Sequence, residues 1–177
     1  VQMTCDSLHN CIQLFLDGSV HWLVVFSHPA VPVFLAPASH PYLMVERDSL
    51  IPVSAPTKSG APLHPLPGRA GSPLPFLQYG SSSYLGKVVD ELLRSVPGKA
   101  NLRVIYEDDL AAGLKAMAVA GHGLAWLPAK VVAAEMASIE ARFESVDRAA
   151  SITRRFLTNP AVVTVGVVAL LTLGRVG

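Results

Sequence analysis

The pattern of apolar and polar positions predicts helices and strands in alternation along the chain. The first helix is expected to begin after Asp6 and Ser7, both good N-cap residues, and to end at Gly18. Its predicted apolar face consists of Leu8, Cys11, Ile12, Phe15 and Leu16. Residues 20–26 follow as an apolar run interrupted by His21, which predicts a strand buried on both faces in a parallel sheet.

Short β-prone pieces fill residues 31–54, and a proline-rich stretch separates them from a second unit. Residues 56–75 hold six prolines in twenty positions, which predicts a loop at the crossing between two lobes. The elements expected in the second unit are a strand at 76–79, a helix from Tyr84 to Pro97, a strand at 102–106, a helix ending at Gly121, a strand at 124–127 and a helix from Pro128 to Met136.

Alternating strands and helices indicate an α/β fold built from right-handed βαβ units. Two such units fit a two-lobed, periplasmic-binding-protein-like (type 2) domain with mostly parallel sheets. The expected boundaries are 1–72 for the first lobe, 73–150 for the second lobe and 151–177 for a return to the first lobe. Residues 160–173 are apolar but fall short of the ~18–20 residues that span a bilayer, so a strand or core helix is predicted there rather than a membrane anchor.

The charge composition argues against nucleic-acid binding by this chain alone. Of the 177 residues, 51% are hydrophobic and 15% are charged, and the formal net charge is +1. Duplex DNA binding needs several clustered basic residues for phosphate contacts, and the sequence has no such cluster. Cys5 and Cys11 are expected to be reduced thiols, because a bridge between them would close too small a loop to serve as a framework.

Serines at predicted helix starts are the leading candidates for ligand contacts. The first group comprises Ser81, Ser82 and Ser83. Three serines exceed what one cap requires, and free N–H groups at a helix start attract anions, although plain capping is the alternative. Ser7 occupies the corresponding place in the other lobe, with the same alternative. Ser27 and His28 end a predicted buried strand, where open α/β sheets bind ligands, and a surface histidine at a turn is the alternative for His28.

Gly121 and His122 complete the candidate ligand contacts. Glycines on both sides of His122 permit an unusual backbone and a close approach of a ligand, or they only tighten a helix-to-strand turn. Asp108 and Asp109 are predicted to be capping charges of the helix that follows them, with a catalytic dyad as the alternative. Met117 is expected to fill the core, with oxidation sensing as the alternative.

Motifs for metal binding, cofactor binding and catalysis are missing from the sequence. The six histidines have no HExxH spacing, the cysteines have no CxxC spacing, and no glycine loop follows the P-loop pattern. A nucleophile elbow, G-x-S-x-G, would need glycine at the position that Tyr84 occupies. The sequence therefore predicts no catalytic residue, no metal site and no cofactor.

Residues 121–128, GHGLAWLP, together with the helix before them, resemble the V-x-A-G-x-G-I-A-x-L-P signature of the effector-binding domain of LysR-type bacterial transcription regulators. Residues 17–23 are similar to the family's L-x-x-G-x-L-D-x-x-I strand, with His21 in place of the usual acidic residue. Residues 50–56 and the serine-rich helix start add to the resemblance, and residues 28–33 resemble the branch that includes hypochlorite-responsive regulators. The resemblance implies that the glycine turn lies beside a ligand cleft between two lobes.

Two departures from the family pattern leave the first lobe incomplete. The chain begins at Val1, without the family's N-terminal winged helix-turn-helix and without the first strand and helix of the sensor domain. The run after Ser151 lacks the family's polar strand and closing helix. The polypeptide is therefore expected to be truncated at its front.

The resemblance implies a cytoplasmic sensor domain and not an enzyme. An unidentified small-molecule effector, with an anion as one candidate, would shift lobe closure in a homodimer or homotetramer. DNA contact would come only through a winged helix-turn-helix outside this chain, and no membrane partner is expected. The alternatives are a stand-alone solute-binding protein of the same fold and a small hydrolase that uses Ser82 or Ser83.

Overall fold

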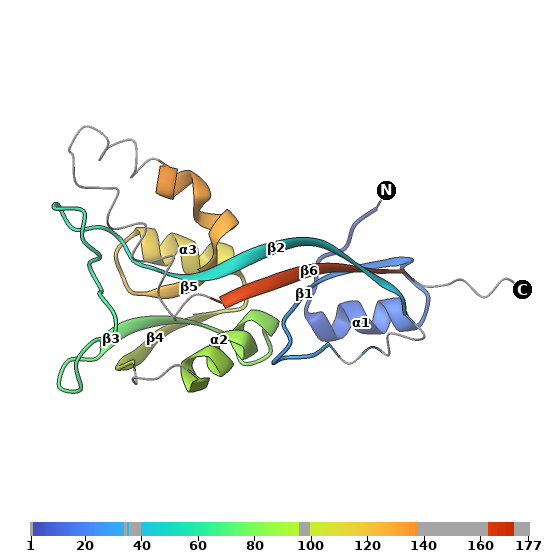
Figure 1. Cartoon of the computed structure of the whole chain (residues 1–177), viewed down its shortest axis with the longest axis horizontal. Helices are drawn as coiled ribbons and strands as arrows, with labels where there is room; N and C mark the ends of the chain where they lie inside the picture. Colours follow the sequence, from blue (N-terminus) through green and yellow to red (C-terminus); the bar gives the residue numbers. More distant parts are fainter. Residues whose placement is uncertain (1, 34, 36–39, 96–99, 138–162, 172–177) are drawn as a thin grey trace, which may run out of the picture.

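The computed structural model describes residues 2–33, 35, 40–95, 100–137 and 163–171, with backbone pairing only for the last segment (Figure 1). Helices and strands alternate from β3 onward, and the mixture of the two confirms the α/β class. In chain order the elements are α1 (Leu8–Leu16), β1 (Trp22–Ser27), β2 (Tyr42–Val53), β3 (Leu74–Tyr79), α2 (Tyr84–Ser95), β4 (Leu102–Asp108), α3 (Ala111–Val119), β5 (Ala125–Pro128), a 3₁₀ helix (Ala129–Val132) and β6 (Val163–Leu171).

The first helix begins where the sequence predicts. The Ser7 hydroxyl accepts a hydrogen bond from the amide of Asn10 at 3.2 Å, and the Asp6 carboxylate accepts one from the amide of Ser7 at 2.6 Å. Gly18 takes a φ of 79°, a left-handed conformation that lets the chain leave the helix without a side-chain clash. Cys5 and Cys11 at this end of the chain are unpaired, as expected.

Four strands form a sheet in the order β1-β6-β2-β5, and all three of its pairings are antiparallel. Trp22 of β1 lies opposite Leu171, and Tyr42 of β2 lies opposite Leu170, so the last strand of the chain returns between the first two. A strand is thus confirmed within residues 160–173. None of the helices in the described part of the chain has the length and hydropathy needed to cross a bilayer.

The expectation of mostly parallel sheets holds only in the second sheet. Strands β3 and β4 pair in parallel, and a parallel bridge joins Phe76 of β3 to Leu124, just before β5. The four-stranded sheet departs from the prediction because β6, from the far end of the sequence, runs against both of its neighbours, and because β5 runs against β2. An apolar run such as 20–26 does not show the direction of the strand beside it.

The main apolar core gathers around β3, β5, α2 and α3, and a smaller core lies under α1. The main core includes Leu50 of β2, Leu77 of β3, Val88 of α2, Leu114 of α3 and Trp126 of β5, with further buried apolar residues around them. The strand β2 contributes Leu50 and Ile51 from its second half to this main core, whereas its first half is exposed. Met117 packs against the main core, the role predicted for it.

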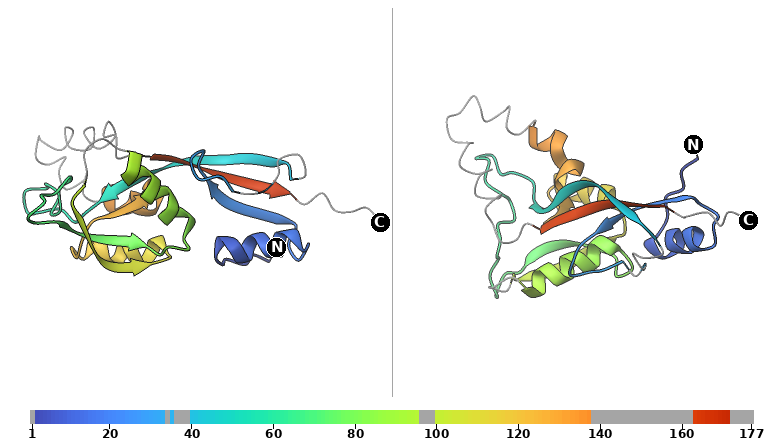
Figure 2. Two further views of the ribbon diagram at one scale, coloured as in Figure 1. Left: turned by 90° about the horizontal axis from the view of Figure 1, so that it is seen from below. Right: turned by 45° about the vertical axis from the view of Figure 1, so that its right-hand side comes forward.

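The smaller core contradicts the prediction that β1 is buried on both faces. Phe15 of α1 and Leu23 of β1 form its buried centre. Figure 2 shows α1 lying on one face of this part of the sheet. On the other face, Trp22 and Val24 are 62% and 61% exposed. No described element covers that face, so the apolar run reflects one buried face and one open face.

Candidate functional site

The serine loop, residues 80–83, lies between the end of β3 and the start of α2. The amide of Gly80 donates to the carbonyl of Asp108 at 3.2 Å, and the amide of Ser83 donates back to the carbonyl of Gly80 at 3.0 Å. Ser81 and Ser82 are exposed and Ser83 is half-buried. The turn therefore presents two hydroxyl groups to solvent directly before a helix start, as the sequence predicts.

A carboxylate already lies against this loop. The Ser82 hydroxyl donates to both oxygens of Asp109, at 3.3 and 3.4 Å. A methyl group at position 80 would collide with the Asp109 carboxylate, so only glycine leaves room for it. Asp109 is exposed and follows β4, which places its negative charge beside the start of α2. In the structure the Ser82 hydroxyl is therefore already paired with a negatively charged group of the protein itself.

Asp108 lies just before the next helix but does not cap it, so the capping prediction is wrong: the N-cap of α3 is Leu110, and no side chain makes a capping bond there. Its carboxylate accepts hydrogen bonds from the amide of Leu110 at 2.9 Å and from the hydroxyl of Tyr106 at 3.1 Å. Its oxygens also approach Gly113 in the first turn of α3 so closely that a side chain there would collide with them. The two neighbouring carboxylates thus have different roles, because Asp109 turns to the serine loop instead.

The hydrogen bond between Asp108 and Tyr106 is expected to move the ionisation of the Tyr106 phenol to higher pH. That hydrogen bond, and then the negative charge of Asp108, raise the pKa of Tyr106 above its ordinary value of 10.0. Because the folded-state pKa is raised, the neutral phenol stabilises the fold below pH 10, and this contribution is lost as the pH rises through the folded-state pKa. Asp108→Asn is therefore expected to shift phenolate absorbance to lower pH. The matched control, Asp90→Asn at an exposed position of α2, should leave the titration unchanged; identical curves for both variants contradict the assignment.

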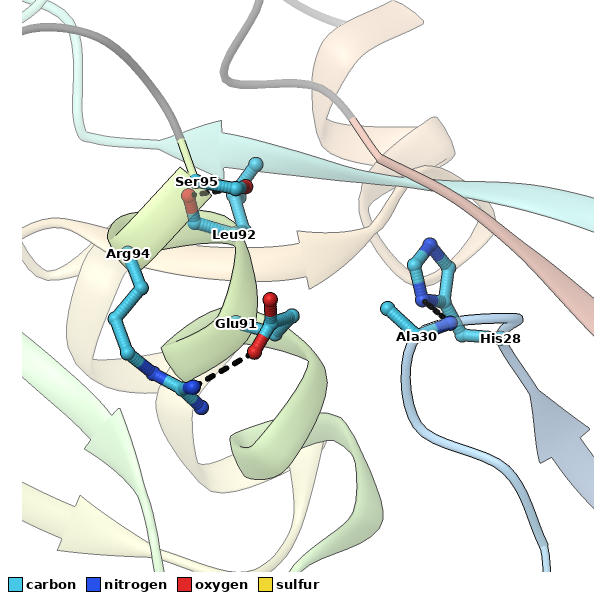
Figure 3. Close-up of polar contacts among 6 residues, drawn as sticks. All are labelled: His28, Ala30, Glu91, Leu92, Arg94 and Ser95. Atoms are coloured by element: carbon cyan, nitrogen blue, oxygen red, sulfur yellow. Dashed lines mark hydrogen bonds and ion pairs between the residues drawn. The ribbon is translucent and has the colours of Figure 1, made fainter.

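The end of β1 lies beside the start of α2, so the structure brings Ser27 and His28 close to the helix start that follows the serine loop. The amide of His28 donates to the hydroxyl oxygen of Tyr84 at 2.6 Å, and that hydroxyl donates to the carbonyl of Val31 at 2.6 Å. Ser27 and His28 are both half-buried. Figure 3 shows the turn from His28 to Ala30 next to α2. His28 therefore lies one hydrogen bond away from the residue that follows the serine loop.

The ring of His28 has a defined tautomer when it is neutral. Its Nδ1 accepts a hydrogen bond from the amide of Ala30 at 3.2 Å (Figure 3). An acceptor at Nδ1 leaves the proton on Nε2, so the neutral ring offers an N–H donor at its outer end. This geometry suits a ligand that carries a hydrogen-bond acceptor.

The start of α1 also lies near the main core. Leu8, the first residue of α1, packs against the main core rather than the smaller one. Figures 1 and 2 both show that the first turn of α1 is the end of this helix nearer to α2. Ser7 is exposed there, but its hydroxyl accepts the capping bond from the amide of Asn10. Its observed contact is therefore that of a helix cap, the alternative to ligand binding.

The glycine turn at Gly121 and His122 lies apart from the serine loop and the end of β1. Gly121 has a φ of 84°, and the amides of Gly121 and His122 donate to the carbonyls of Ala118 and Met117 at 3.0 and 3.1 Å. These two bonds form a Schellman motif, which ends α3 and explains why glycine is needed. The Nε2 atom of His64 lies 3.1 Å from the carbonyl oxygen of Gly121, a methyl group on Gly121 would face Leu63 and Ala55, and His122 is exposed.

Distance along β3 separates this turn from the serine loop. Leu124 pairs with Phe76 near the beginning of β3, whereas Gly80 follows the last residue of that strand. Four residues of strand correspond to about 13 Å. The structure therefore brings Ser27, His28 and the serine loop together, and it does not bring Gly121 and His122 to the same place.

Solved structures of known regulators share this arrangement of strands and helices. The regulatory domain of HypT from Salmonella typhimurium matches with a TM-score of 0.75 and 17% identity over 99% of this chain and 75% of that domain. DarR from Vibrio fischeri, solved in complex with DNA, matches with a TM-score of 0.69 and 19% identity over 99% of this chain and 53% of that one. This chain has the fold of LysR-type regulatory domains. The two-lobed, periplasmic-binding-protein-like fold predicted from the sequence is confirmed.

The LysR regulatory fold accounts for only part of a complete regulator. Full-length HypT, described as a hypochlorite-specific LysR-type transcriptional regulator, matches with a TM-score of 0.77 and 17% identity over 99% of this chain. The chain spans about half of that protein, 53% of its length. No protein-family model matches the sequence, and no curated protein matches it.

Within this LysR fold, the sequence does not reveal two important site residues. Tyr84 reads as the first apolar position of an amphipathic helix, and its hydroxyl partners lie 53 and 56 positions away. Asp109 reads as a helix cap, although it contacts Ser82, 27 positions earlier. Among the described residues, no group of three or more histidine, cysteine, aspartate or glutamate side chains is arranged to hold a metal ion.

Proposed function

We propose that this chain is the effector-binding domain of a LysR-type transcription regulator. The observation that carries the proposal is the meeting of the end of β1 with the serine loop at the start of α2, within the LysR regulatory fold. Hydrogen-bond donors from two separate parts of the chain converge there. Donors that converge from separate elements on one place are typical of a small-molecule site.

The lobes of this proposal follow the boundaries expected from the sequence. Residues 1–72 form the first lobe, residues 73–150 form the second, and residues 151–177 return to the first. The pairing of β6 with β1 and β2 supports the return. The effector changes the relation between the lobes, and DNA-binding modules elsewhere on a homodimer or homotetramer respond in the bacterial cytoplasm.

The proposed effector carries an anionic group, and Asp109 is its internal competitor. Ser82 and the amides at the start of α2 suit a carboxylate, and the structure supplies one from Asp109. An incoming carboxylate must displace Asp109 before it can accept the same hydroxyl. His28 offers a further donor on the neighbouring segment. In this proposal Gly121 and His122 shape the fold and do not contact the effector.

Binding of small carboxylates to site variants tests the proposal. Ser82→Ala is expected to weaken binding about tenfold, because a hydrogen bond to a charged group contributes ~1.5–3 kcal/mol. Asp109→Asn is expected to tighten binding severalfold, because it removes the competing charge. The measurement is a thermal-shift screen with a panel of small carboxylates, followed by calorimetric titration of any hit.

The control for this test is Ser59→Ala in the proline-rich loop. Ser59 is exposed, and its hydroxyl contacts only Thr57 among the bonds found for it. If Ser59→Ala weakens binding as much as Ser82→Ala does, the effector does not bind at the serine loop. Weaker binding to Asp109→Asn contradicts the anionic class and points to a cationic group instead.

We infer that Ser82 is not a nucleophile. A catalytic serine needs a base that takes its proton, and the base is oriented toward a reacting centre. The Ser82 hydroxyl instead donates to a carboxylate that lies against the glycine of its own loop. Hydrolysis of a simple aryl ester by the native chain that Ser82→Ala abolishes would contradict this inference.

A further inference from the structure

We propose that the Tyr84 hydroxyl is a latch between the segment that leaves β1 and the start of α2. The segment, residues 28–33, connects β1 to the rest of the first lobe, and α2 belongs to the second lobe. Movement of these two parts relative to each other must break both hydrogen bonds of one hydroxyl group. The latch is independent of any ligand, and only its regulatory consequence rests on the proposed function.

The contacts of the hydroxyl define a closed arrangement. His28 donates its amide to the Tyr84 oxygen at 2.6 Å, and the Tyr84 hydroxyl donates to the carbonyl of Val31 at 2.6 Å. His28 and Val31 also form an antiparallel bridge with each other, because the amide of Val31 donates to the carbonyl of His28 at 3.0 Å. Tyr84 thus fills the two remaining backbone positions of a tight turn with one side chain.

Packing holds the phenol ring on the α2 side. Tyr84 is 8% exposed and belongs to the main core, against which Val31 and Val33 also pack. Burial raises the pKa of Tyr84, so the hydroxyl stays protonated and keeps its donor over the physiological pH range. Replacing this tyrosine with phenylalanine would leave the half-buried amide of His28 and the half-buried carbonyl of Val31 without these bonds.

The position of Tyr84 in the chain gives the latch a regulatory consequence. Tyr84 directly follows Ser83, so a ligand that displaces the serine loop also displaces the hydroxyl from the turn at His28. Two interactions made or broken together give an element with two discrete states, which is what a switch between lobe arrangements requires. On this view a ligand at the proposed site shifts the population of the latched state.

Amide hydrogen exchange on Tyr84→Phe and Tyr79→Phe tests the latch. Tyr79 is the matched control because it is 3% exposed, and its hydroxyl has no hydrogen-bond partner among the described residues. Both variants remove one buried hydroxyl, but only Tyr84→Phe removes bonds to the turn. Exchange over residues 27–33 is expected to become at least about tenfold faster in Tyr84→Phe. In Tyr79→Phe it should change by less than about twofold.

Equal exchange over residues 27–33 in the two variants overturns the proposal. If Tyr84→Phe fails to fold by circular dichroism, the native chain still decides the question by NMR. The amide of His28 must then exchange at least about tenfold more slowly than the rate for an unstructured chain. An unprotected His28 amide in the native chain overturns the latch. Neither measurement uses a ligand, so failure of the effector site and failure of the latch are distinguishable.

Discussion

Replacing Trp126 with alanine is expected to lower the free energy of unfolding by about 3–5 kcal/mol. Trp126 is 1% exposed within β5, and its ring meets the ring of Phe76 edge to face at a centroid distance of 5.8 Å. The main core around it draws on β2, β3, α2 and α3, so the cavity would open where these four elements meet. Chemical denaturation followed by circular dichroism measures the loss.

The matched control for this experiment is Trp22→Ala. Trp22 lies on the open face of β1 and is 62% exposed, so its removal should cost less than about 1 kcal/mol. Circular dichroism is the proper signal because each variant removes one of the two tryptophans, which changes the fluorescence directly. Equal losses for the two variants would show that β5 is not the centre of the core.

Helices could be predicted from the sequence because their signals are local. The Ser7 cap and its bond to Asn10 lie within one helical turn. The second helix, α2, presents its apolar positions to the main core from Tyr84 onward, and the predicted and observed starts agree. Capping and periodicity act over a few residues, so the side chains that determine them are visible in the sequence itself.

Strand direction and exposure could not be predicted in the same way. The partner of β1 is β6, and Trp22 pairs with Leu171 near the opposite end of the chain. The sequence of residues 20–26 does not indicate that the neighbouring strand is β6 or that it runs antiparallel. The open face of β1 escaped prediction for a related reason, because an apolar strand resembles a buried one whether or not another element covers it.

The candidate site residues differ in the same way: some are positioned by local contacts and others by contacts between distant parts of the chain. The turn at Gly121 has the conformation that its glycine indicates, since the Schellman bonds join residues within one turn. Its location relative to the serine loop depends on the register between Leu124 and β3, which the sequence does not show. The meeting of His28 with Tyr84 is likewise a tertiary contact, and it is the one on which the proposed function depends.

The substitution Gly123→Ala is expected to lower the free energy of unfolding by about 1–3 kcal/mol, the usual cost of overpacking a buried site. A methyl carbon on Gly123 would lie 2.7 Å from the carbonyl oxygen of Pro75 and 3.0 Å from Cγ of Leu77. The Pro75 carbonyl accepts the amide of Leu124 at 2.9 Å, so relieving the clash must move β3 away from the strand that holds Trp126. Gly71→Ala is the matched control, because a methyl group there meets no atom within 4 Å. Denaturation midpoints for the two variants decide the matter: if both chains unfold together with the native chain, the close approach between residue 123 and β3 does not exist in solution.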